Sequence, residues 1–189
     1  MKTLFFAAAA VSAVLAAPAF AQDAPAASGP RVEALVGFDS ISLNLEDLGV
    51  DDSLEQSGFL YGVGLGYDFA LGGMSLGLDV EATDSTAELG DDDYGAIDAA
   101  RDLYAGARVT FPVAASNINA YVKGGYTNAR FKGEFDGESE GDNLDGFRLG
   151  AGAQVALSGK AYVGTEYRYS NYEADLTRHQ FALVVGTRF

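Results

Sequence analysis

Apolar residues stand at alternate positions near the C-terminus of this chain, at Phe181, Leu183, Val185 and Phe189. Successive side chains of a β-strand point to opposite faces, so these four share one face of a strand at about 179–189. The same period of two recurs in seven earlier segments, with approximate bounds of 31–42, 58–70, 74–83, 101–111, 118–130, 146–157 and 161–172. Eight such segments predict an all-β fold. No stretch reaches the roughly 20 apolar residues that a membrane-spanning helix needs.

The N-terminal stretch has the organisation of an export signal. Lys2 precedes an apolar run, and the small residues Ala19 and Ala21 then form an A-x-A pattern. Segments of this kind are removed on secretion, so we expect cleavage before Gln22. The chain has no cysteine, which excludes disulfides and thiolate metal sites. The expected organisation is a signal peptide over 1–21, a flexible lead-in over 22–29 and one barrel domain over 30–189.

The two faces of the predicted strands differ in chemistry. One face is apolar, whereas the other carries glycine, tyrosine and charged residues of both signs. The charged residues of this second face are Arg31, Arg108, Lys123, Arg148, Arg168 and Arg188, with Glu33, Asp68, Asp79, Glu81, Asp102 and Glu166. A buried charge is costly unless it is paired, so we expect a luminal network in which these groups neutralise one another.

Two uses of this luminal network are open. It could pack the interior and control strand register, with glycines leaving room for Tyr104, Tyr121 and Tyr162 to fold inward. It could instead line an ion pathway gated by Arg–Glu pairs. An eight-stranded barrel is just wide enough for side chains to fill, which favours packing.

The apolar face is graded along each strand, and this grading separates a membrane barrel from a soluble one of the lipocalin type. Aliphatic residues such as Val63, Leu65 and Leu78 occupy the middle of the strands. Aromatic residues occupy the two ends, at Phe38, Phe59, Tyr61, Tyr126, Phe147, Tyr167, Tyr169 and Phe181 and at Tyr67, Phe69, Phe111 and Phe189. Two aromatic girdles around an aliphatic band match a bilayer with two interfaces. We therefore predict an eight-stranded antiparallel up-and-down transmembrane β-barrel.

The connections between the predicted strands alternate in length. Three are short turns, and the others are longer loops, as in bacterial outer-membrane barrels. This alternation predicts an integral outer-membrane protein with both termini in the periplasm and the long loops outside the cell. Outer-membrane lipid and lipopolysaccharide are the expected surroundings, and we expect a monomer.

The expected loops carry most of the surplus negative charge. The chain has a net charge of −15, which becomes −16 once the leader with Lys2 is removed. Such loops repel nucleic acid, so polyanion binding is disfavoured. They could simply be solvated, or they could capture Ca²⁺ or Mg²⁺, which prefer oxygen ligands. Asp136, Glu138 and Glu140 loosely resemble the start of a calcium loop, but Phe147 stands where its closing Glu would be.

The sequence gives little support for catalysis. Its one histidine, His179, has Ser170 and Asp175 nearby in sequence, which makes only a weak catalytic constellation, since a lone histidine at an interface is far more often structural. The Gly-x-Gly-x-Gly of residues 62–66 lies within a predicted strand and not before a helix, so it is no phosphate loop. We expect neither an enzyme nor a bound cofactor.

Two segments, AYVGTEYRYSNYE (161–173) and RHQFALVVGTRF (178–189), resemble the last strands of the small outer-membrane β-barrel family of Gram-negative bacteria. That family includes OmpX-like, opacity-type and porin-family surface proteins. The strongest part of the resemblance is the group Tyr162, Glu166, Tyr167, Arg168 and Tyr169. Thr187 departs from it, since an aromatic is common there.

The resemblance implies an eight-stranded barrel that the outer-membrane assembly machinery inserts. It identifies the alternating residues that end at Phe189 as the C-terminal assembly signal, and it implies no catalytic residues. Family members are structural surface proteins, some adhesins and a few weak porins. The function expected here is a structural barrel that contributes to envelope integrity and surface properties, with a narrow non-specific channel or a surface adhesin as alternatives.

Overall fold

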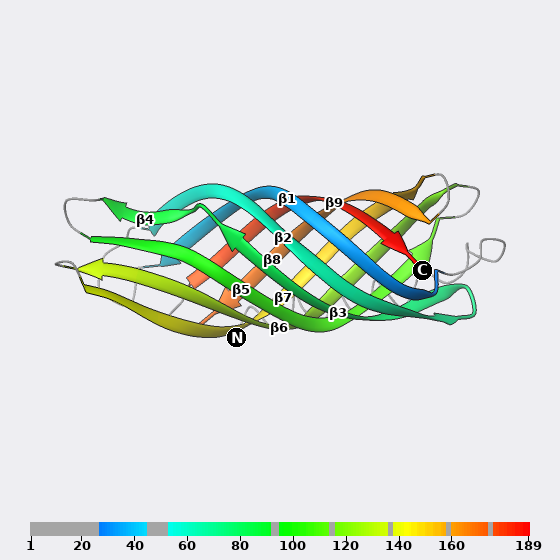
Figure 1. The fold of residues 1–189 in the computed structure, drawn as a ribbon, viewed down its shortest axis with the longest axis horizontal. Helices are drawn as coiled ribbons and strands as arrows, with labels where there is room; N and C mark the ends of the chain where they lie inside the picture. Colours follow the sequence, from blue (N-terminus) through cyan, green and yellow to red (C-terminus); the bar gives the residue numbers. More distant parts are fainter. Residues whose placement is uncertain are drawn as a thin grey trace.

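The computed structural model describes residues 27–44, 53–91, 95–113, 116–135, 138–157, 160–173 and 176–189, which form one antiparallel β-sheet. The strands are β1 (Gly29–Asn44), β2 (Ser53–Leu71), β3 (Met74–Ser85), β4 (Glu88–Asp91), β5 (Gly95–Pro112), β6 (Ile118–Phe135), β7 (Glu138–Ala156), β8 (Ala161–Tyr172) and β9 (Leu176–Arg188). Figure 1 shows these strands tilted around a common axis. Within the described ranges, no helix is long and apolar enough to span a membrane.

The sheet closes on itself and has eight positions around the barrel. Strands β1 and β9 pair along their length, as in Val36 opposite Leu183, and β3 pairs with β5, as in Leu78 opposite Ala107. The short strand β4 follows β3 after a break and pairs only with β5, so β3 and β4 together fill one position. The predicted eight-stranded antiparallel barrel is confirmed.

Most strands extend further than the sequence pattern indicates, chiefly at the long-loop end. Strand β5 begins at Gly95 and β7 at Glu138, where loops were expected up to about residues 100 and 145. Several acidic residues assigned to loops therefore lie in strands, at Glu55, Asp84, Glu88, Asp91, Asp98, Glu134, Glu138, Glu140, Asp142 and Asp145. Hydrogen bonds hold a β-ladder together whatever its side chains are, and beyond the bilayer neither face has to be apolar. The period-two signal is therefore lost where the ladder continues.

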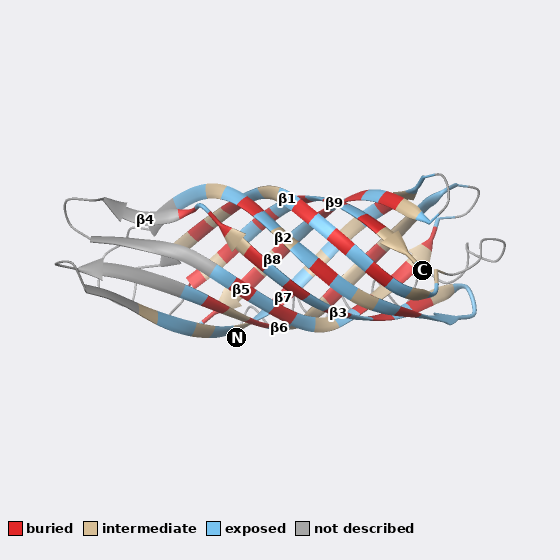
Figure 2. Cartoon of the chain, in the orientation of Figure 1, coloured by how far each residue is buried: buried red, intermediate tan, exposed pale blue. Residues whose placement is uncertain are grey.

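Burial along each strand is the inverse of that in a soluble barrel. Leu65 and Val185 are each 57% exposed on the outer face, whereas Arg148 and Glu166 are 0% and 1% exposed in the interior. Figure 2 shows this as alternating bands of buried and exposed residues. The exposed apolar band, with Phe38 and other aromatics at its ends, matches a surface in contact with lipid. A soluble barrel with the apolar face inside is ruled out.

The interior also contains two apolar clusters that the sequence analysis did not anticipate. One lies on the wall formed by β1, β2, β8 and β9 and consists of Leu35, Leu60, Tyr162, Ala182 and Val184. The other lies near the long-loop ends of the strands and consists of Ile41, Ala87, Ala129, Tyr172 and Leu176, with Leu144 packed against them. The second cluster caps the charged part of the interior at that end.

The charged interior as candidate functional site

The charged side chains of the interior form two networks, the first of which lies nearer the short turns. Its members are Arg31, Arg108 and Arg188 with Glu33, Asp68 and Asp79. Arg108 makes a bidentate ion pair with Glu33, in which Nη1 donates to Oε1 at 2.9 Å and Nη2 donates to Oε2 at 3.0 Å. Its Nε donates to Asp79 Oδ2 at 2.9 Å. Such planar, paired contacts are the strong form of an ion pair.

Arg31 and Arg188 complete this first network. Arg31 pairs with Asp79 and lies 3.6 Å from Asp68 Oδ2 through its Nε. Arg188 Nε donates to the same Asp68 oxygen at 3.3 Å. The hydroxyl of Tyr162 donates to Glu33 Oε1 at 2.8 Å, so a neutral side chain also stabilises this carboxylate.

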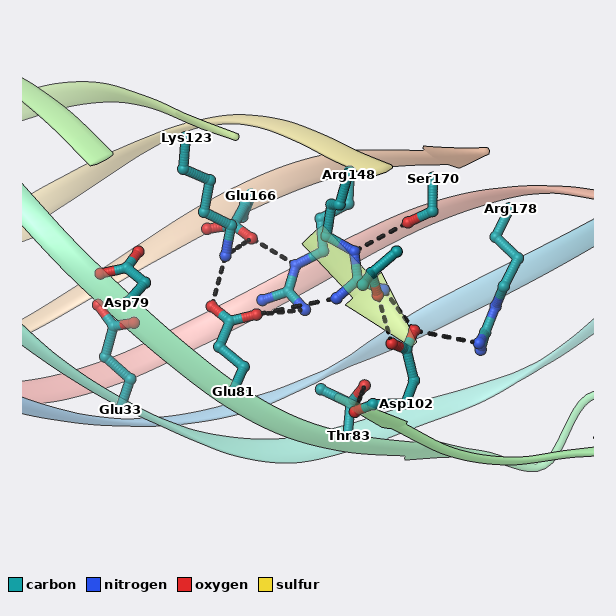
Figure 3. Close-up of polar contacts among 12 residues, drawn as sticks. Glu33, Asp79, Glu81, Thr83, Asp102, Lys123, Arg148, Glu166, Ser170 and Arg178 are labelled. Atoms are coloured by element: carbon teal, nitrogen blue, oxygen red, sulfur yellow. Dashed lines mark hydrogen bonds and ion pairs between the residues drawn. The ribbon is translucent and has the colours of Figure 1, made fainter. Parts of the chain in front are cut away.

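The second network lies nearer the long-loop end, and Figure 3 shows several of its members. Its members are Lys123, Arg148, Arg168 and Arg178 with Asp39, Glu81, Asp102 and Glu166. Lys123 Nζ joins two carboxylates, at 2.5 Å from Glu81 Oε1 and 2.6 Å from Glu166 Oε1. Arg148 pairs with Asp102, and its Nε donates to Ser170 Oγ at 2.8 Å.

Asp102 is the most heavily shared acid of the second network. Besides Arg148, it binds Arg178 Nη1 at 3.2 Å, and it accepts hydrogen bonds from Thr127 Oγ1 at 2.6 Å and from the Tyr172 hydroxyl at 2.8 Å. Tyr172 also belongs to the apolar cap, so the second network and the cap are joined.

Each network is electrically neutral, and no ion pair joins the two among the described residues. The first has three cations and three anions, and the second has four of each. Tyr121 connects them, because Arg108 lies 4.3 Å from the centre of its ring and its hydroxyl donates to Glu166 Oε2 at 2.7 Å. Neutral networks in which every charged group has an oppositely charged partner meet the condition under which buried charges are tolerated.

Luminal glycines provide the room that these large side chains need. A Cβ atom on Gly152 would stand 2.5 Å from Tyr121 Cζ, so the tyrosine ring occupies the space that any other residue would fill. Tyr162 lies over Gly186 in the same way, and the guanidinium of Arg31 over Gly66. These glycines make close approach across the lumen feasible.

The luminal residues assigned from the sequence all lie in these two networks: Asp79 and Arg108 in the first, and Glu81, Lys123, Arg148, Glu166 and Arg168 in the second. Sequence reasoning missed Asp39 and Arg178, which pair with each other. Asp39 lies within the expected strand 31–42 on the same face as Arg31 and Glu33, and Arg178 lies one residue before the expected strand 179–189, so the alternation of these two strands contains the signal for both. The sequence pattern stopped short of Arg178 because an expected loop began there.

Other assigned residues lie elsewhere. Phe181, Leu183, Val185 and Phe189 are exposed on the outer face. The cleavage-site residues Ala19, Ala21 and Gln22 and the acidic Asp136 lie outside the described residues. Glu138 and Glu140 belong to strand β7, where the structure describes their backbone only.

The histidine does not form a catalytic group with the serine considered above. His179 is exposed on the outer face, where Tyr167 OH lies 2.7 Å from its Nδ1. Ser170 is buried in the interior, bound to Arg148. The barrel wall therefore separates the two side chains, and Asp175 lies outside the described residues.

Comparison with known proteins places this fold in context. Residues 7–189 match the family model described as outer membrane protein beta-barrel domain. The structure is similar to Neisserial surface protein A (17% identity, 86% of this chain and 98% of that one, TM-score 0.63). It is also similar to Ail, the attachment invasion locus protein of Yersinia pestis (17%, 86% and 100%, 0.52), and to the N-terminal β-barrel domain of Pseudomonas aeruginosa OprF (15%, 86% and 100%, 0.54). No curated protein matches the sequence.

Proposed function

Because this chain belongs to the outer-membrane β-barrel domain family, we propose that it is a structural barrel that contributes to envelope integrity and surface properties. It is an integral outer-membrane protein, and neither the family nor the similar structures indicate an enzyme. The observation that carries the structural role is the filled interior. Two neutral ion networks and an apolar cap, including Ile41 and Leu176, occupy the space through which a solute would have to pass.

This arrangement favours the structural role over a narrow non-specific channel. A permeant ion would have to separate pairs such as Arg108–Glu33, each of which would then hold an unpaired buried charge. It would also have to pass between apolar side chains at the long-loop end. The channel alternative has no comparable observation in its favour.

Electrical recording distinguishes the two roles directly. The purified protein, refolded and reconstituted into a planar lipid bilayer, is expected to give no stable stepwise conductance, because its lumen is filled. An open porin added to the same bilayer is the control that shows channels would be detected. Reproducible unitary steps that scale with the amount of this protein would reject the structural role in favour of the channel.

The orientation and partners proposed here follow from the ends of the barrel. We propose that both termini face the periplasm, which the position of the C-terminus at the short-turn end supports (Figure 1). The long-loop end then faces outward among lipopolysaccharide. Divalent cations could bridge its acidic residues to lipid phosphates, and the same end would carry any adhesin role. The chain is proposed to act as a monomer.

The C-terminal residue supports a proposed contact with the outer-membrane assembly machinery. Because Phe189 is 62% exposed, its ring adds little to internal packing. Its backbone N–H donates to Pro30 O at 3.0 Å. Deleting Phe189 is expected to lower the amount of assembled barrel in cells several-fold, as measured by heat-modifiable gel mobility of outer-membrane fractions. Refolding of the same variant into detergent is expected to stay normal. Unchanged assembly in cells would refute the proposal that Phe189 acts as an assembly signal.

A further inference from the structure

The positive charges of this chain are distributed unevenly. Seven of its 12 lysine and arginine residues belong to the two interior networks, and Lys2 lies in the expected leader. The other four are Arg101, Arg130, Lys132 and Lys160. Three of these four lie at the long-loop ends of the neighbouring strands β5 and β6, although this end of the chain is otherwise rich in acidic residues. Lys132 stands opposite Asp98 in the pairing of β5 with β6, so the two adjacent cations that need an explanation are Arg101 and Arg130.

A β-bulge brings Arg101 and Arg130 next to each other. The register between β5 and β6 shifts between Ala99, which pairs with Phe131, and Asp102, which pairs with Ala129. Arg130 therefore faces the two-residue stretch that contains Arg101. Bulges of this kind re-aim side chains and occur at the rims of barrels. Like charges on facing residues repel, so this pair is unfavourable unless an anion lies close to it.

Neither arginine has a protein partner in the part of the chain that the structure describes. Both side chains are exposed, and neither makes an ion pair or a hydrogen bond there. Two carboxylates lie near by and are engaged elsewhere. Asp84, next to the last β3–β5 pair and so beside Arg101, accepts a hydrogen bond from the Ser85 N–H at 2.8 Å and makes no ion pair with that arginine. Asp145, on neighbouring strand β7, accepts hydrogen bonds from the Tyr126 hydroxyl at 2.5 Å and from Asn128 Nδ2 at 2.6 Å. Arg130 lies across Gly141, with its Nε 2.9 Å from the place of a glycine Cβ. Its guanidinium therefore lies against the outer surface of β7.

The two arginines stand at the outer edge of the lipid-facing band. Leu103, two residues after Arg101, is 40% exposed, and Tyr126, four residues before Arg130, is 53% exposed on the same face. Aromatic residues of barrels mark the level of the membrane interface, so the guanidinium groups lie at the level of lipid headgroups. Guanidinium groups bind phosphate with paired, charge-assisted hydrogen bonds.

We propose that Arg101 and Arg130 form a binding site for the phosphate of an outer-leaflet glycolipid of the lipid A type. The lipid phosphate is the counter-ion of the two arginines, which otherwise repel each other. The contact also attaches one lipid to the barrel at a fixed position on its circumference. This inference rests on the proposed orientation, with the long-loop end outward.

Lipid retention tests the site on the full mature chain. The protein is refolded into bilayers of neutral lipid that contain either phosphorylated lipid A or its dephosphorylated form, and bound lipid is measured by native mass spectrometry. The wild type is expected to retain the phosphorylated form in preference. In the R101Q/R130Q variant, the ratio of phosphorylated to dephosphorylated lipid retained is expected to fall about tenfold. Two exposed charge contacts of roughly 0.7 kcal/mol each would give this change. The control variant Lys160→Gln removes an exposed cation at the opposite end of the barrel and is expected to keep the wild-type preference for the phosphorylated lipid.

The possible outcomes separate the site from the function on which it rests. Equal retention of both lipids by the wild type, or an unchanged preference in R101Q/R130Q, would overturn the proposal. Displacement of the lipid by equimolar inorganic phosphate would also overturn it, since the site would then hold a free anion. Heat-modifiable mobility of each variant reports whether the barrel is folded, so a failure of folding and insertion is distinguishable from loss of the lipid site.

Discussion

Replacing Arg108 with methionine is expected to lower the free energy of unfolding by about 3–5 kcal/mol, the usual effect of removing one member of a buried ion pair. Arg108 is 1% exposed and holds both oxygens of Glu33 and one of Asp79. Without it, the first network has three carboxylates and two cations. Methionine fills much of the same volume, so the loss reports the unpaired charge more than a cavity. Urea unfolding in lipid vesicles measures this loss of stability. Tyrosine fluorescence, which no tryptophan obscures in this chain, and gel mobility follow the unfolding.

Two further variants establish the cause of this loss. Arg108→Met combined with Glu33→Leu is expected to recover part of the stability, since it removes one of the stranded carboxylates. Lys160→Met removes an exposed cation and is expected to change stability by less than about 0.5 kcal/mol. If Arg108→Met were as harmless as Lys160→Met, the interior pairing would not be what stabilises the barrel.

Replacing Gly152 with leucine is expected to destabilise the barrel by about 3 kcal/mol, at the upper end of the usual cost of overpacking. The Cβ atom of the leucine alone would stand 2.5 Å from Tyr121 Cζ and 2.5 Å from the backbone oxygen of Thr165. The backbone oxygen cannot move aside easily. The tyrosine would have to leave its place between Arg108 and Glu166, which uncouples the two ion networks. Urea unfolding in vesicles measures the loss.

Gly64→Ala is the control for adding a side chain at a luminal glycine that has room for one. Gly64 also faces the interior, but a Cβ atom there would meet its nearest neighbour, Glu81 Cγ, at 3.4 Å, which is an ordinary contact. Alanine at this position is expected to be tolerated, and its lower backbone entropy in the unfolded state offsets small adjustments. Equal destabilisation by the two substitutions would show that the glycine recess under Tyr121 has no special role.

The barrel wall was predictable because lipid imposes the same rule on every strand. A side chain such as Leu65 or Val185 must be apolar where it meets the bilayer, and its neighbours in sequence must then face the interior. The rule does not reach beyond the membrane. The outer parts of β5 and β7 follow no alternation, so the sequence pattern predicts loops there.

The pairing inside the barrel was predictable only as a class of interaction. Alternation assigned Arg108, Arg148 and Glu166 to the interior, but not the partner of each. Partners depend on register and on the curvature that brings distant strands together, as with Arg108 and Glu33, which are 75 residues apart. Arg178 was missed because it lies next to a predicted loop, and Leu35 because the alternation read its face as polar.

The amino-acid sequence by itself determined which face of each strand meets lipid and which residues enter the interior, because a period of two follows from the geometry of a single extended strand. Only the tertiary structure decided that the interior charges divide into two neutral networks joined by Tyr121, and that a bulge sets Arg101 beside Arg130. Both features arise from how neighbouring strands are aligned when the sheet closes, and no segment of the chain contains that alignment on its own.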